Sequence, residues 1–382
     1  MIRTITLVSG LLLAVATTGV AQVKISPQPD FTAEEALRRE IRQTLKSLTG
    51  SDAYYRIHTS ALFAKASVDL KPFLNDILPE MEKALKDAEP AVRRNAAAFA
   101  ELQGPAAHSL VPSLIELLKD DEVSSRVNAA SALAAMGRDA AKATPTLILL
   151  LKDADEDVRY NACRALAAVG PMLQAEAMDA FINVSNDSSA DVRRVTMTGI
   201  RTSSLGLIGA PTEKLLDCLK KRMKDDSVQV RRETIRTIAE KLNNAKIVLP
   251  LLQEAIQDAH PSVQEFAADA LQNLGEEAVP TLVNLIEHDR AEVRYQAVWA
   301  LGFLMEYAQP SFPKLIARLK NDPDAKVRAR IAIAFGSFRD DPKDIIPVLE
   351  AALKDADKTV RARAQETLDL FEARKMKAMM KE

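Results

Sequence analysis

An arginine that follows an aspartate by six residues recurs along most of this 382-residue chain. With Gln264 in place of one arginine, successive copies are 33, 33, 34, 38, 33, 30, 34 and 33 residues apart. A fixed period of this length is the sequence signature of a stacked repeat architecture. The repeat positions are Arg93, Arg126, Arg159, Arg193, Arg231, Gln264, Arg294, Arg328 and Arg361, with a weaker copy at Arg56.

Each copy predicts two helices joined by a short acidic turn. A proline eight residues before the aspartate position, as at Pro145, marks the start or a kink of the first helix. The second helix carries an apolar stripe with a period of 3.6 residues, which must be covered by neighbouring helices. In the third full copy we expect burial of Val158, Ala162, Cys163, Ala165 and Leu166. The pattern predicts an all-α fold, an α-α superhelix of about ten stacked helix pairs.

Composition limits the function classes. The 51 basic and 53 acidic residues give a net charge of -2, so the chain lacks the excess of positive charge typical of nucleic-acid binders. Glycine-rich phosphate loops and the common metalloprotease, redox and serine-hydrolase motifs are absent from the sequence, and the four histidines are isolated. We therefore expect no catalytic site, no metal and no cofactor. Cys163 and Cys218 lie two repeats apart, which predicts two unlinked buried thiols.

The amino terminus predicts export. A charged start, an apolar run from Leu7 to Ala16 and small residues at Gly19 and Ala21 are typical of a signal peptide. The run is shorter than the roughly 20 residues of a membrane span, although an uncleaved anchor remains the alternative. The predicted organisation is a signal peptide over residues 1–21, a tether and first helix over 22–48, a solenoid over 49–371 and a tail over 372–382. We expect the mature protein to begin at Gln22 and to contain no stable membrane span. Its expected location is the periplasm or the extracellular space.

The repeated arginine allows two interpretations. Eight guanidinium groups in register could bind phosphates, but each has an aspartate nearby, so pairing within or between repeats is the favoured interpretation. As surface pairs they would each contribute about 0 to 1 kcal/mol. The long spacing of 38 residues includes TSSLGLIGAP at 202–211, which predicts either a tolerated loop or a bend.

The repeat resembles the HEAT repeat family, in particular the HEAT-like repeats of phycobilisome lyases, with D-x-x-x-x-V-R followed by A-x-x-A-L-G. The better copies are DEDVRYNACRALAAVG, AEVRYQAVWALGF and DKTVRARAQETLDL, and the match covers about residues 50 to 371. The resemblance implies a superhelix that binds other macromolecules. Its lyase branch also implies assistance in attaching a bilin to a protein, which export disfavours.

We interpret the chain as an exported, non-enzymatic scaffold that binds a protein or peptide along its concave second-helix face. The alternatives are an enzyme-assisting protein of the lyase type and a binder of anionic polymers through basic middle repeats, while the oligomeric state is left open. Positions one, five and eight after the repeat arginine are expected to form the binding face, including Gly302. The alternative for Trp299 is packing between helices. The candidate partner-binding residues are Tyr295, Trp299, Ile333, Tyr160, Arg164, Arg194, Arg201, Arg232 and Arg236.

Overall fold

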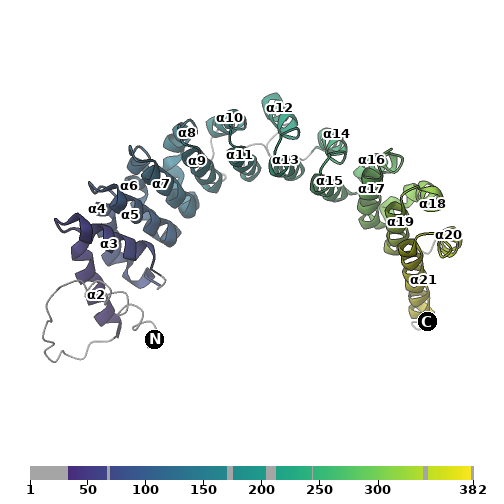
Figure 1. Ribbon diagram of the computed structural model, residues 1–382, viewed down its shortest axis with the longest axis horizontal. Coiled ribbons are helices and arrows are strands. Elements are labelled where there is room, and N and C mark those ends of the chain that lie inside the picture. The colour runs from purple at the N-terminus through teal and green to yellow at the C-terminus, as the bar shows by residue number, and fades with distance from the viewer. Residues whose placement is uncertain are drawn as a thin grey trace. The chain divides into compact units, whose positions relative to one another are not determined.

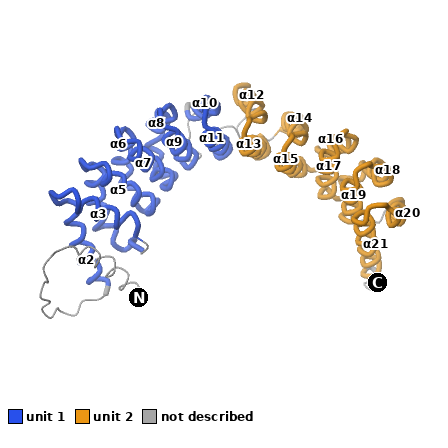
Figure 2. The backbone as a smooth tube through the Cα atoms, viewed as in Figure 1, with its two compact units in different colours: residues 1–205 blue, residues 206–382 orange. Residues whose placement is uncertain are grey.

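A computed structural model describes residues 33–66, 69–169, 175–203, 212–242, 244–338 and 343–379. Every regular element in these ranges is a helix, as the repeat predicts (Figure 1). The chain divides into two compact units, residues 1–205 and 206–382 (Figure 2). The boundary falls within the 202–211 segment. Most of that segment lies outside the described residues, as do the predicted signal peptide and the tether.

The first unit contains five helix pairs in its described part. The second helices of these pairs are α3, α5, α7, α9 and α11. Short 3-10 segments, η1 to η3, precede three of the first helices. In chain order the elements are α2 (Ala33–Leu48), α3 (Ala53–Ala64), η1 (Lys71–Phe73), α4 (Leu74–Ala84), α5 (Pro90–Gln103), η2 (Gly104–Leu110), α6 (Val111–Leu117), α7 (Val123–Met136), η3 (Gly137–Ala143), α8 (Thr144–Leu150), α9 (Glu156–Val169), α10 (Ala175–Val184) and α11 (Ala190–Thr202).

The second unit repeats the same plan with five further pairs among its described residues. Its second helices are α13, α15, α17, α19 and α21, and the last is the longest helix of this unit. In chain order the elements are α12 (Glu213–Arg222), α13 (Val228–Lys241), α14 (Ala245–Ala255), α15 (Pro261–Asn273), η5 (Gly275–Ala278), α16 (Val279–Leu285), α17 (Ala291–Phe303), η6 (Met305–Ser311), α18 (Phe312–Asn321), α19 (Ala325–Ser337), α20 (Ile346–Ala352) and α21 (Lys358–Met379).

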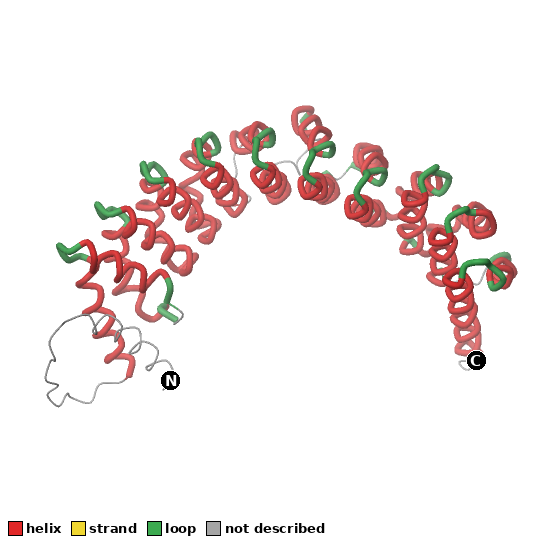
Figure 3. Tube along the Cα trace, in the orientation of Figure 1, coloured by secondary structure: helices red, strands yellow, loops and turns green. Residues whose placement is uncertain are grey.

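Within each unit the second helices pack side by side and form one layer, while the first helices form the other (Figure 3). The predicted apolar stripe fills the space between them. Val158, Ala162, Cys163, Ala165 and Leu166 have no solvent-exposed surface, which confirms that prediction. Small alanine side chains let neighbouring helices approach closely and pack densely. Burial of this apolar surface supplies most of the favourable free energy of folding.

A left-handed residue ends several second helices. Gly104, Gly137 and Gly275, each eleven positions after the repeat residue, have φ values of 53°, 58° and 63°. Glycine adopts this conformation without steric penalty. At the same position after Arg294 stands Met305, with φ of 47°. The backbone at the end of α17 is therefore held in a conformation that this residue type rarely adopts.

Both cysteines are buried, and they are not joined in a disulfide, as predicted. The predicted tail over 372–382 starts inside α21, which continues to Met379. There the Arg374 guanidinium donates to the carbonyl oxygens of Gly336 and Phe338 at 2.7 and 2.6 Å, which ties the end of the chain to α19. None of the described helices is long and apolar enough to cross a membrane.

Candidate protein-interaction surface

The repeated arginines connect successive helix pairs. Arg159 Nη1 donates to the carbonyl oxygens of Asp153 and Ala154 in its own turn. Its Nε and Nη2 donate to both carboxylate oxygens of Asp187 in the next repeat, at 2.6 and 2.9 Å. Pairing is thus between repeats, and the aspartate six residues earlier contributes only its backbone oxygen. The same pairing joins Arg56 to Asp87, Arg93 to Asp120, Arg126 to Asp153, Arg231 to Asp258, Arg294 to Asp322 and Arg328 to Asp355.

This ladder of ion pairs is more buried than the sequence suggested. The side chains of Arg159 and Asp187 are only 13% and 7% exposed. Burial by itself would raise the pKa of Asp187, but hydrogen bonds from Arg159 and from the Ser189 amide outweigh it, and the pKa is lowered. The expectation that these pairs lie at the surface is therefore wrong, and removing one partner would leave the other charge buried.

One rung of the ladder, meaning one arginine–aspartate pair between neighbouring repeats, is missing because both of its residues are replaced. Gln264 Nε2 still donates to the carbonyl oxygen of Asp258 at 2.7 Å, but Gln264 carries no charge. The aspartate place of the next repeat is occupied by His288, whose Nδ1 accepts from the Arg290 amide as the aspartates accept elsewhere. The Arg290 guanidinium then donates to the carbonyl oxygens of Gln257 and Asp258 at 2.6 and 3.2 Å. A basic side chain bound to backbone oxygens here takes the place of an ion pair.

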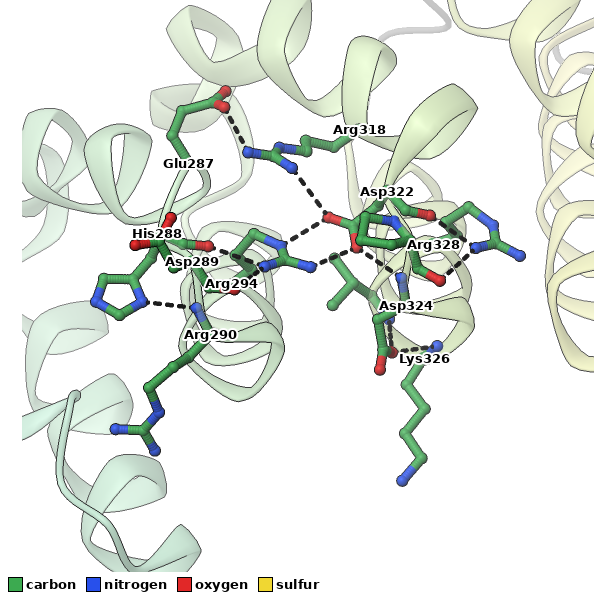
Figure 4. A network of polar contacts seen from close by, with 12 residues as sticks. Glu287, His288, Asp289, Arg290, Arg294, Arg318, Asp322, Asp324, Lys326 and Arg328 are labelled. Carbon is green, nitrogen blue, oxygen red and sulfur yellow. Dashed lines mark hydrogen bonds and ion pairs between the residues drawn. The ribbon is translucent and has the colours of Figure 1, made fainter.

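The following rung is the most buried described one. Arg294 and Asp322 have 4% and 0% exposed side chains and share two hydrogen bonds of 2.7 Å. Arg318 adds a second positive charge 3.6 Å from Asp322 and also binds Glu287 (Figure 4). Guanidinium groups paired in this way are occupied within the protein, so the ladder does not supply a row of free cations for phosphates.

The solvent-facing side of the second helices, which the sequence predicts to bind a partner, differs slightly in position from that prediction. Residues one and five after the repeat arginine are at least partly exposed on α17, as with Tyr295 and Trp299. Gly302, eight after, is buried, and a Cβ there would lie 3.3 Å from the Ala334 Cβ. Its inclusion was wrong because the neighbouring helix α19 covers this position with Ala334. Phe303, nine after, occupies the exposed place instead.

Tyr295, Trp299 and Phe303 form an aromatic stripe along α17. The Trp299 and Phe303 rings lie 4.7 Å apart at a tilt of 57°. Phe303 is 48% exposed, while Tyr295 and Trp299 are partly buried. Trp299 therefore packs against its neighbours and still reaches solvent. Clustered aromatic side chains of this kind are enriched where protein partners bind.

Arg330 on α19 covers one side of this stripe. Its guanidinium carbon lies 6.0 Å from the Tyr295 ring centroid and 5.8 Å from that of Trp299. Burial lowers the pKa of Arg330, and its buried Nε has no hydrogen-bond partner among the described residues. A cation–π contact compensates part of this desolvation, but the guanidinium keeps unused donors. Ile333, one of the predicted residues, lies partly buried on the same helix.

The neighbouring helix α15 presents acidic groups on the same face. Glu265 and Asp269, one and five after Gln264, are both exposed. Partial desolvation of the carboxyl and the nearby charge of Glu265 both raise the pKa of Asp269. The sign reversal expected from the sequence at this repeat is thus present, and a cation bound here would relieve the repulsion between the two carboxylates.

The predicted basic side chains are mostly engaged locally. In the first unit, Arg164 is exposed and donates to Asn161 Oδ1 at 3.0 Å, and Arg194 pairs with Asp191 at 3.3 Å. Tyr160 and Arg201 are partly buried. In the second unit, Arg236 pairs with Glu240 at 2.8 Å, and the Arg232 guanidinium carbon lies 4.5 Å from the Phe266 ring centroid.

Sequence reasoning missed Phe303 and Arg330. Phe303 could have been found by extending the one-and-five spacing to nine, which follows the same helical face. Arg330 has no signal within its own repeat, because its role depends on the aromatic residues of the preceding repeat. No cluster of histidine, cysteine and carboxylate side chains that could hold a metal occurs in the described ranges.

Comparisons with known proteins agree with this architecture. The profile of the family described as HEAT repeats matches residues 111–201, 144–239, 248–311 and 312–381, more than half of the chain. The chain belongs to the HEAT repeat family. No curated protein matches this HEAT-repeat chain by sequence.

Similar solved structures share its fold at low identity. An engineered protein is 20% identical, with a TM-score of 0.51 over 87% of this chain and 99% of that one. Kap95 in its complex with Nup1 is 16% identical, with a TM-score of 0.63 over 88% of this chain. Kap95p bound to RanGDP is also 16% identical, with a TM-score of 0.62 over 88% of this chain. This chain spans about half the length of the Kap95 chains, at 52% and 51%.

Proposed function

We propose that this HEAT-repeat protein is an exported, non-enzymatic scaffold that binds a partner polypeptide along the face of its second helices. The HEAT-repeat solenoid is commonly a protein-interaction scaffold, and the solved structures of Kap95 with Nup1 and with RanGDP are of complexes with other proteins. The proposal depends chiefly on the aromatic stripe of Tyr295, Trp299 and Phe303, because stacking of the repeats does not require exposed aromatic rings.

The second-helix layer suits an extended partner. Successive helices present equivalent positions at regular intervals, so a chain lying across them meets one short row of side chains per repeat. The ladder ties each turn to the next repeat, as Arg159 does with Asp187, and such cross-links favour a pre-organised face and lower the entropy lost on binding.

The two alternatives have less support. An enzyme-assisting role would call for a deep pocket with converging polar groups. The proposed binding residues lie instead at exposed and partly exposed positions of successive helices. Binding of an anionic polymer would call for free cations, whereas Arg194 and Arg236 are paired with carboxylates.

Affinity capture from the native envelope, followed by mass spectrometry, tests the proposal. The full chain should retain a specific protein that Trp299→Ala does not retain. The matched control is Tyr54→Ala, which removes an exposed aromatic ring from α3 in the first unit. Equal retention by wild type and both variants would contradict binding at this face.

Export is tested separately. The apolar run and the small residues before Gln22 support cleavage at that site. Amino-terminal sequencing of protein from the native host should begin at Gln22. Recovery of chains beginning at Met1 in the cytoplasm would contradict export and return cytoplasmic partners to consideration.

A further inference from the structure

The aromatic stripe lies between two helices that carry opposite charges available for binding. α15 presents Glu265 and Asp269, and α19 presents Arg330 beside Tyr295 and Trp299. No ion pair engages these three charged side chains within the described part of the second unit. They differ in this respect from the ladder residues and from Arg236, which have carboxylate partners. The order across the face is therefore acidic, aromatic, basic.

The spacing of these groups fits a short extended peptide. α15 packs against α17, and α17 packs against α19. Stacked helices are roughly 8 to 10 Å apart, so the axes of α15 and α19 are about 16 to 20 Å apart. The Arg330 guanidinium reaches back over the α17 rings, so this distance is an upper bound for the separation of the charged groups. An extended chain advances about 3.3 Å per residue, so about five or six residues cover the distance.

We propose that this surface binds an extended segment of a partner protein with a lysine or arginine against Glu265 and Asp269, an apolar side chain against Trp299, and an aspartate or glutamate against Arg330. The inference rests on the proposed function and specifies the partner's chemistry. Arg330 supplies the most specific contact, because its planar guanidinium binds a carboxylate through two parallel hydrogen bonds and is held in place by the rings beneath it.

Charge complementarity favours a protein over a nucleic acid. A strand of phosphates crossing α17 toward α15 would bring negative charge against Glu265 and Asp269, which repel it. A peptide can alternate its charges. A positive group at α15 removes the repulsion between the two carboxylates, and a negative group at α19 compensates the desolvation of Arg330.

The test uses the full chain and four blocked peptides of seven residues. Each has a central leucine, with serine and glycine spacers, and the ends are Lys and Glu, Glu and Lys, Lys and Lys, or Glu and Glu. Trp299 is the single tryptophan, so its fluorescence reports binding directly. One of the two mixed-charge peptides should bind at least about tenfold more tightly than either like-charged peptide, a difference of about 1.4 kcal/mol.

Charge reversal separates recognition from loss of folding. Arg330→Glu should shift the preference to the Lys–Lys peptide, and the double change Glu265→Lys, Asp269→Lys should shift it to the Glu–Glu peptide. The matched controls, Lys320→Glu on α18 and Glu276→Lys with Glu277→Lys on η5, change exposed residues of the same sign and should keep the original preference. A gained preference cannot arise from an unfolded variant.

Several outcomes would overturn the inference. These are equal binding of all four peptides, unchanged preference in the reversed variants, or displacement of the peptide by heparin or an oligonucleotide. If a native partner is captured and Arg330→Glu does not weaken its binding, this site is wrong and the scaffold function stands. If the peptides behave as expected but no envelope protein is captured, the site stands and the proposed function fails.

Discussion

Arg159 on α9 donates two hydrogen bonds to the carboxylate of Asp187, which begins the turn after α10. Both side chains are almost fully buried. The same guanidinium binds two backbone oxygens of its own turn, so one residue fixes the turn of its repeat and the position of the next. Because neighbouring repeats share each rung, disruption of one pair should affect the stability of the array beyond its own repeat.

Arg159→Ala should lower the free energy of unfolding of its transition by about 3 kcal/mol, since it leaves Asp187 buried without its partner. Arg164→Ala, an exposed change on the same helix, should alter it by less than about 0.5 kcal/mol. Urea unfolding of both variants measures the difference, compared in the same transition because repeat arrays can lose two-state behaviour. Equal effects would mean that the ladder contributes no more than a surface pair.

The ladder also predicts a loss of stability in acid. The hydrogen bond from Arg328 is the main cause of the lowered pKa of Asp355, against a smaller opposing effect of burial. A carboxyl whose pKa is lower in the folded state stabilises the fold above its unfolded pKa of about 3.9 and loses that contribution as the pH falls through the folded pKa. The unfolding free energy should therefore fall steeply below about pH 4. Asp355→Asn should reduce this slope, and an unchanged slope would show that other groups control it.

Cys163 should be unreactive in the folded protein. Burial raises the pKa of its thiol to about 12, so at pH 8 about one molecule in ten thousand carries the thiolate. Its sulfur lies 3.6 Å from Thr196 Oγ1 in the core between α9 and α11. An aromatic disulfide reagent should react with Cys163 only after unfolding in urea, as followed in a Cys218→Ala variant. Rapid labelling of the native protein would indicate frequent local opening of this region.

Trp299→Ala should weaken partner binding by about 2 kcal/mol or more while leaving the fold intact. The indole is partly exposed, so its fluorescence should be partly quenched by iodide before binding and protected afterwards. Phe335→Ala provides the contrast, because Phe335 is fully buried and its loss should destabilise the unit by about 3 to 5 kcal/mol. If Trp299→Ala unfolds as readily as Phe335→Ala, the indole belongs to the core.

The fold could be predicted because its information is repeated. Most copies contain the turn aspartate, the arginine and the apolar stripe, so an irregular copy such as that of Gln264 does not hide the pattern. The candidate binding surface was harder to predict from the sequence, because Arg330 gains its role only from contact with Tyr295 and Trp299 of another repeat. The depth of the ladder was also not visible in sequence. Burial of Asp322 depends on how closely two repeats pack, whereas the spacing of charged residues is the same for exposed and buried pairs.

The ladder can also be tested by restoring a pair instead of removing one. Gln264 and His288 occupy the arginine and aspartate positions of the missing rung. Gln264→Arg alone would bring a guanidinium near Arg290 without a carboxylate, and His288→Asp alone would leave a carboxylate without its usual arginine. Each single variant should be neutral or destabilising. The double variant should recover a favourable coupling of about 1 to 3 kcal/mol, which a double-mutant cycle of unfolding free energies measures. Arg290 then loses its replacement role, so Arg290→Ala should be better tolerated in the double variant than in the wild type. A coupling below about 0.3 kcal/mol would mean that the two substitutions are independent and that Arg290 does not replace the rung.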